Sequence, residues 1–146
     1  MTGRATPRIL MVTPEISYLP AQAGGIAQFY RAKAGGLADV TAGLLKTLFD
    51  KGADAHLAIP FYRPMFKSGL PDYLRESFGE LLETLPENRI HLIENERFTY
   101  MESVYSADGL ENTRIALAFQ KAVIQDIIPA IQPDLIHCHD WMTSLI

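Results

Sequence analysis

The fold is restricted most strongly by one series of elements: a short apolar run, then a glycine-rich segment, an amphipathic helix and a second apolar run. Residues 9–12 are apolar without polar alternation, which is typical of a strand buried on both faces of a parallel sheet. Residues 37–51 repeat apolar side chains at helical steps and end at the helix-stop signal Lys51-Gly52. The inward positions expected there are Leu37, Val40, Leu44, Leu45 and Leu48. With a strand at 55–59, this predicts a right-handed βαβ unit.

The rest of the chain predicts further elements of the same kind. We expect strands at 89–93, 98–105 and 135–139, a short helix near 73–85, a longer helix at 111–131, and the beginning of another helix at 142–146. The longer helix is expected to turn one apolar set inward: Ile115, Leu117, Ala118, Ala122, Ile124, Ile127 and Ile128. The fold class is therefore α/β, with a Rossmann-like parallel sheet flanked by helices in one domain.

Composition limits the classes of function and compartment. The 146 residues carry a formal net charge of −4, which argues against nucleic-acid and anionic-membrane partners, because those proteins have basic faces. The single cysteine, Cys138, cannot form an internal disulfide, which favours a reducing compartment. Residues 1–4 begin no signal peptide, and no apolar run has the length of a membrane span. We therefore expect a cytoplasmic domain.

The turn between the first strand and the first helix has residues suited to an anion. Lys33-Ala34-Gly35-Gly36-Leu37 places a cation and two glycines before a helix N-terminus, where unpaired N–H groups and the helix dipole favour phosphate. The alternative is an ordinary glycine-containing turn, since neither GxGxxG nor the Walker pattern is present. Asp39, one turn into the helix, either faces the same ligand or complements the dipole.

A second polar cluster comes after the last predicted strand. His139 and Asp140 fall beyond its carboxyl end, where open α/β sheets bind ligands. A metal site of His137, His139 and Asp140 would need further ligands, and the chain has no CxxC or HExxH pattern, so we expect none. We interpret His137 as a histidine packed inside the sheet and Cys138 as a small core residue.

Three segments, in this order, resemble the glycogen/starch synthase family of retaining glycosyltransferases. They are Thr13-Pro14-Glu15 after the first strand, the stretch from Lys33 to Val40 (KAGGLADV), and residues 133–141 (PDLIHCHDW). Asn112-Thr113-Arg114 also resembles the helix before the family's His-Asp-Trp strand. The resemblance covers nearly the whole chain, although the middle matches loosely.

The resemblance implies a fold, an activity and site residues. Family enzymes have the GT-B architecture of two Rossmann-like domains and transfer glucose from ADP-glucose or UDP-glucose to the non-reducing end of an α-1,4-glucan. By this resemblance, Lys33 contacts the phosphates, Gly35 and Gly36 let backbone amides approach, and Asp39 lies on the sugar side. His139 contacts the glucosyl unit, and Asp140 holds the loop. No metal or other cofactor is expected, so cationic groups and helix dipoles must balance the leaving diphosphate.

The chain departs from the family pattern in two respects. Seventeen residues separate Glu15 from Lys33, where the family has about seven, and Gln22-Ala23-Gly24-Gly25 echoes the later Gly-Gly segment at the usual spacing. We assign the phosphate role to Lys33 and expect that the longer loop could alter acceptor access. The chain also ends shortly after Trp141, so residues 1–146 are expected to be a truncated N-terminal, acceptor-side domain. Its partner, the C-terminal nucleotide-sugar domain, would then be absent and this piece inactive alone.

Two other classes of function remain open at this point. A stand-alone Rossmann-like binding or regulatory module would keep the fold without catalysis, and the reading frame beyond residue 146 would distinguish it from the enzyme. A nicotinamide or flavin oxidoreductase fits less well, because GxGxxG and an acidic residue at the end of the second strand are both missing.

Overall fold

The structure is a computed structural model that describes residues 5–83 and 89–146, and a four-stranded parallel sheet lies at its centre. The strands are β1 (Arg8–Val12), β2 (Asp54–Pro60), β3 (Ile90–Ile93) and β4 (Leu135–Cys138), in the order β3-β2-β1-β4. Leu10, Met11 and Val12 are fully buried, which confirms the prediction of a first strand covered on both faces. This order is that of the first half of a doubly wound sheet.

Helix α1 (Gly36–Asp50) connects β1 to β2 and ends as predicted. Gly52 has φ of 71°, and Ala53 donates its N–H to the Leu48 carbonyl, which makes a Schellman cap. The inward face differs from the expectation at Val40, which is 63% exposed. Leu45 is buried as expected, but Val40 lies outside the buried face of the helix. That face consists of Ala38, Thr41, Ala42, Leu45 and Phe49.

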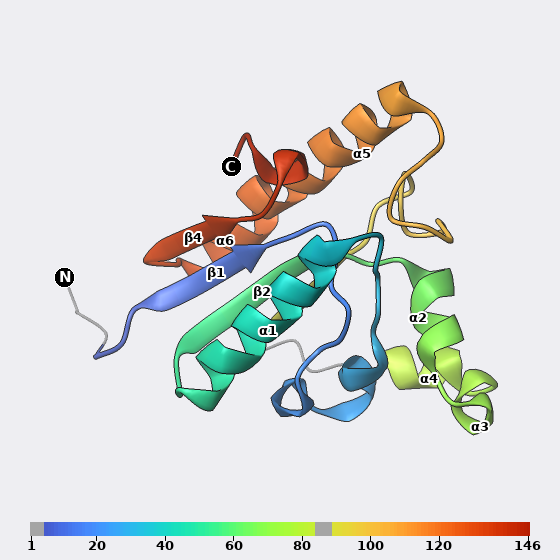
Figure 1. Cartoon of the computed structure of the whole chain (residues 1–146), viewed down its shortest axis with the longest axis horizontal. Helices are drawn as coiled ribbons and strands as arrows, with labels where there is room; N and C mark the ends of the chain where they lie inside the picture. The colour runs from blue at the N-terminus through green and yellow to red at the C-terminus, as the bar shows by residue number, and fades with distance from the viewer. Residues whose placement is uncertain (1–4, 84–88) are drawn as a thin grey trace.

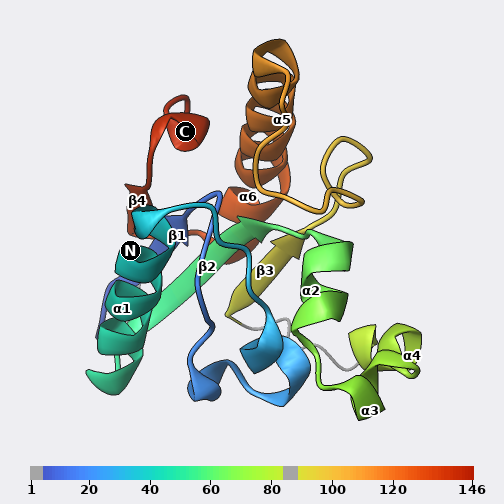
Figure 2. The ribbon, with the colours of Figure 1, turned by 45° about the vertical axis from the view of Figure 1, so that its right-hand side comes forward.

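The longer helix is continuous but changes its pitch. It consists of α5 (Gly109–Ala122), a π-helical turn (Val123–Ile127) and α6 (Ile128–Ile131). The wide turn precedes Pro129, which has no N–H for the helical ladder and would otherwise clash with the preceding turn. Leu117 and Ile124 are exposed, so the inward prediction was wrong for these two, since the buried stripe runs through Ile115, Phe119 and Val123. Helix α1 and the α5–α6 helix lie on opposite sides of the sheet (Figure 1 and Figure 2).

Three other predictions differ from the structure. The helix expected near 73–85 is divided into α3 (Asp72–Arg75) and α4 (Phe78–Leu82), preceded by α2 (Arg63–Gly69), while 84 and 85 lie outside the described residues. The strand expected at 98–105 was wrong, because Thr99 and Phe98 donate their N–H groups to the Asn95 carbonyl in a local turn. The helix expected to begin at 142–146 is a single 3-10 turn, Trp141–Thr143.

The long segment between β1 and α1 is closed at its neck by an antiparallel bridge between Ile16 and Ala32. Between these residues it makes two 3-10 turns, Ala21–Ala23 and Gly25–Phe29. It is anchored by the fully buried Tyr30, which donates its hydroxyl proton to the Pro60 carbonyl at the end of β2. The Tyr30 ring also packs edge-on against Phe66 of α2. The segment therefore belongs to the core of the domain.

Candidate functional site

The carboxyl ends of β1 and β4 define the candidate site. The chain leaves β1 toward β2 through α1 and reaches β4 through a connection on the opposite face, so the strand order reverses between β1 and β4. Such a switch point is where open α/β sheets bind ligands. His139, the residue after β4, donates its backbone N–H to the Val12 carbonyl at 2.9 Å. The segments after the two strands therefore begin side by side.

Residues 33–36, which we call the glycine loop, begin where the bridge at Ala32 ends and lead into α1. The carboxylate of Glu15 accepts hydrogen bonds from the backbone N–H groups of Ala34 and Gly35, the latter at 2.9 Å. Glu15 is only 2% exposed, although it is charged. Glu15 was not among the predicted site residues; a carboxylate shortly after a buried strand is the signal that could have identified it. The amide of Gly35, which the family resemblance assigned to a phosphate, is engaged by Glu15 in this structure.

Lys33 and Asp39, the two predicted charged residues of this segment, contact each other. The Lys33 ammonium lies 2.9 Å and 2.7 Å from the two carboxylate oxygens of Asp39. Hydrogen bonds, first from Lys33 and then from Ser17, lower the pKa of the Asp39 carboxyl. Both side chains are about half exposed, at 51% and 58%. The ammonium is therefore held at the surface by a pair that solvent weakens, and an anion of higher charge could displace Asp39.

The two glycines of the loop have no packing role among the described residues. A Cβ at Gly36 would meet no atom within 4 Å, and one at Gly35 would meet only Glu15, at an ordinary 3.8 Å. Neither residue has a positive φ. Within the helix, at Gly36, glycine is less favourable than alanine, so the fold gains nothing from this residue. Gly35 is the N-cap residue, a position that glycine does favour. Open space in front of Gly36 fits a ligand that approaches the backbone.

His139 brings a buried nitrogen without a partner to the same strand ends. It is 7% exposed, and its Nε2 makes no hydrogen bond within the part of the chain that the structure describes. Burial, and then the neighbouring His137 ring stacked at 4.4 Å, lower the pKa of His139. A neutral imidazole with a free nitrogen can donate a hydrogen bond to a substrate hydroxyl or accept one from it.

Two neighbours of His139 differ from the predictions. His137 is exposed, so the interpretation as a histidine packed inside the sheet was wrong, because β4 is an edge strand with an uncovered face in this structure. Cys138 is only partly buried, so it lies at the edge of the core and not, as was expected, within it. Burial raises the pKa of its thiol, which does not suit a nucleophile.

Asp140 has an unfavourable backbone conformation at the site. Its φ of 69° and ψ of 173° lie in a region that is nearly restricted to glycine. Its carboxylate accepts the N–H of Trp141 at 2.7 Å, and its carbonyl accepts the hydroxyl proton of Thr143 at 2.9 Å. The hydrogen bonds hold a strained turn directly after His139, and such strain is concentrated at functional sites.

The Gly24-Gly25 echo lies far from this site. Gln22, which precedes it, donates a hydrogen bond at 2.9 Å to Asp50, the last residue of α1. A helix of 15 residues is about 22 Å long, so Gln22 and the glycine loop lie at opposite ends of it. Of the two Gly-Gly segments, only Gly35-Gly36 is at the carboxyl end of β1.

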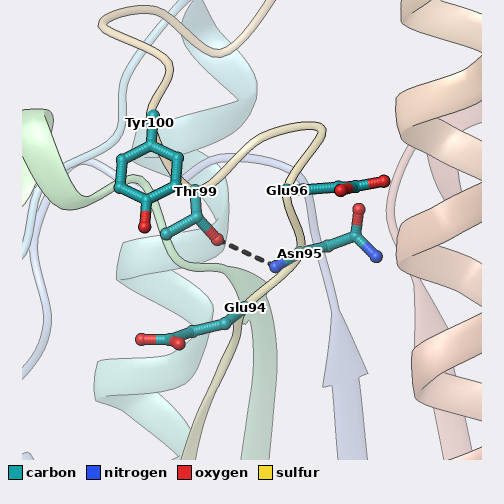
Figure 3. A pocket seen from close by; sticks show the side chains of 5 residues that line it. All are labelled: Glu94, Asn95, Glu96, Thr99 and Tyr100. Carbon is teal, nitrogen blue, oxygen red and sulfur yellow. Dashed lines mark hydrogen bonds between the residues drawn. The ribbon is translucent and has the colours of Figure 1, made fainter.

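A shallow pocket of about 220 Å³ lies in the segment after β3 (Figure 3). Its lining consists of Glu94, Asn95, Glu96, Thr99 and Tyr100. The Thr99 hydroxyl accepts the Asn95 N–H at 2.8 Å, and Tyr100 is 70% exposed. Glu94 and Glu96 are exposed. The sequence predicted no site residue in this segment, since its apolar alternation indicated a strand.

No group of three histidine, cysteine or acidic residues at 5–83 and 89–146 is arranged to hold a metal ion. Over the same residues, no helix is long and apolar enough to cross a membrane.

The fold and site define a class: a Rossmann-like α/β domain whose charged and glycine-rich loops lie at the carboxyl ends of the two strands that flank the switch point. The family model of the starch synthase catalytic domain matches residues 8–146. The chain belongs to the starch synthase catalytic domain family.

Several glycogen synthases are similar to the chain in sequence. The glycogen synthase of Moorella thermoacetica is 34% identical over 95% of this chain and 28% of its own length. Glycogen synthase of Geotalea uraniireducens and glycogen synthase 2 of Geobacter metallireducens are 34% and 36% identical, each over 79% of this chain and 27% of its own length. The chain thus spans little more than a quarter of the relatives it matches. No solved structure matches it significantly.

Proposed function

We propose that the protein containing this chain transfers glucose from a nucleotide sugar, ADP-glucose or UDP-glucose, to the non-reducing end of an α-1,4-glucan, with retention of the α configuration. The observation that carries the proposal is that the KAGGLADV and HDW segments lie at the carboxyl ends of two adjacent strands, β1 and β4. Glu15, after β1, accepts hydrogen bonds from Ala34 and Gly35, and His139, after β4, donates its N–H to Val12. The names of the similar glycogen synthases support the same reaction.

Each site residue has a role consistent with its surroundings. The Lys33 ammonium leaves Asp39 and pairs with the diphosphate, whose charge makes it the stronger partner. The amide of Gly36 and those of the next two residues, which have no helical partner, add N–H donors and the positive end of the α1 dipole. Asp39, once released, accepts a sugar hydroxyl. The free Nε2 of His139 contacts the glucosyl unit, and the Asp140 turn fixes its position.

The remainder of the longer protein is the partner in this proposal. The second Rossmann-like domain of the GT-B architecture would supply further cationic groups and close over the donor, which positions the reactants and excludes water. Residues 1–146 alone are then inactive, and the reaction needs no metal. The single cysteine supports a cytoplasmic location, where thiols stay reduced.

The test is an assay of the full-length natural protein with glycogen and either ADP-glucose or UDP-glucose carrying a labelled glucose. Label that β-amylase releases from the polymer, together with an α-anomeric signal in the NMR spectrum of the product, supports the proposal. Absence of transfer from both donors, with the protein folded, overturns it and favours a binding module. Transfer by residues 1–146 alone would contradict the requirement for a second domain.

A further inference from the structure

The glycine loop depends on one buried side chain from another segment. On one side it is fixed by the bridge at Ala32, whose N–H and carbonyl both bond to Ile16, at 2.9 and 2.8 Å. On the other side α1 begins at Gly36, and its N-cap residue, Gly35, has no side chain to cap the helix. Between these points, Ala34 and Gly35 are held by the hydrogen bonds that their backbone N–H groups donate to the Glu15 carboxylate.

Glu15 itself is held rigidly. The Thr13 hydroxyl donates to the Glu15 carbonyl at 3.0 Å, and the fully buried Tyr62 donates its hydroxyl proton to the Pro14 carbonyl at 3.2 Å. A buried carboxylate is stable only when its charge is compensated, and here two N–H groups and the N-terminus of α1 compensate it. Charge-assisted bonds of this kind are stronger than neutral ones. The carboxylate therefore fixes the loop relative to β1.

Lys33 lies directly before the two amides that Glu15 binds. Its only polar side-chain partner among the described residues is the exposed Asp39, which solvent weakens. We propose that Glu15 is a positioning residue, whose carboxylate holds the glycine loop so that Lys33 faces the diphosphate of the donor. The inference rests on the proposed function, and it extends that function to a residue outside the predicted site.

The test uses four variants of the full-length protein. Three are single substitutions, Glu15→Ala, Glu15→Gln and Lys33→Ala, and the fourth combines Glu15→Ala with Lys33→Ala. We expect Glu15→Ala to raise the KM for ADP-glucose and the Kd for ADP at least about tenfold, with a smaller change in kcat. Glu15→Gln keeps an oxygen acceptor for both amides and should stay within about threefold of the wild type. Amide hydrogen exchange of a peptide covering 33–36 should be faster in Glu15→Ala.

The double variant separates positioning from general stability. If Glu15 acts through Lys33, Glu15→Ala adds less than about threefold to the Kd for ADP once Lys33 is alanine. Leu45→Ala, in the buried face of the same helix, is the control for lost stability and should leave the KM unchanged. An unchanged KM and Kd in Glu15→Ala, or fully multiplicative effects in the double variant, would overturn the inference while leaving the proposed function intact. If the wild-type protein binds ADP but transfers no glucose, the proposed function is overturned. The Kd values of the variants for ADP still test whether Glu15 positions the loop.

Discussion

A pair of histidines on β2 and β3, of which His56 is buried and His91 partly exposed, predicts that the fold loses stability in mild acid. Nδ1 of His56 on β2 lies 3.1 Å from Nε2 of His91 on β3, and the other His56 nitrogen lies 3.2 Å from the Asp54 carboxylate. Burial, and then the neighbouring His56, lower the pKa of His91 to about 4. Burial also lowers the pKa of His56, although the Asp54 charge opposes this change.

The sign and size of the effect depend on proton binding in the two states. The unfolded chain takes up a proton near pH 6.5, and the folded chain at His91 only near pH 4, so stability is lost as the pH falls through this interval. For His91 the difference corresponds to about 2 kcal/mol between pH 7 and pH 5. Because His91 is partly exposed, solvent screening reduces this to about 1 kcal/mol.

Urea unfolding at pH 7 and pH 5 measures the effect directly. His91→Gln keeps a hydrogen-bond partner for His56 but does not titrate, so it should lose about 1 kcal/mol less than the wild type between the two pH values. Equal losses in the wild type and His91→Gln would show that the histidine pair is not the source of the acid sensitivity.

Four further substitutions test the glycines and the strained turn. Gly69→Ala should lower the free energy of unfolding by at least about 1 kcal/mol, because its Cβ would lie 2.6 Å from the Phe29 carbonyl oxygen. Gly43→Ala meets no atom within 4 Å and should raise it by about 0.5–1 kcal/mol in the same urea experiment; equal effects would contradict both assignments. Asp140→Gly should raise the melting temperature by relieving the positive φ yet reduce glucose transfer, and lower stability would show that the turn is not strained. Gly36→Ala should not lower the melting temperature but should weaken ADP binding measured by calorimetry; unchanged binding would show that no ligand lies in front of Gly36.

The regular elements could be predicted because their signals are local. The apolar run of β1, the helical repeat of α1 and the glycine after Lys51 each depend on neighbouring residues, and the structure has all three. The segment at 98–105 could not be read in this way, because Asn95 side-chain and backbone hydrogen bonds replaced the ladder that its alternation suggested.

The site could be predicted only in part, because half of it depends on contacts between distant segments. Lys33, Asp39 and His139 were identified by type and position, and the pairing of the first two is a structural finding. The position of Glu15 after β1 could have marked it as a candidate, but its role depends on a contact across 19 residues of chain, which the sequence alone does not give. The exposure of His137 depends on which elements pack against the faces of β4, a long-range property that the strand's own sequence does not contain.

The glycine loop at the end of β1 is proposed to bind the donor of a glucosyl transfer. Its most direct test is the rate of glucose transfer to glycogen by the full-length protein, with Lys33→Ala beside Lys46→Ala. The Lys46–Asp50 pair is a matched control, since it is similarly exposed at the other end of α1. We predict that Lys33→Ala lowers transfer by at least about 100-fold and that Lys46→Ala leaves it unchanged. Equal transfer by the two variants would contradict the assignment of the loop.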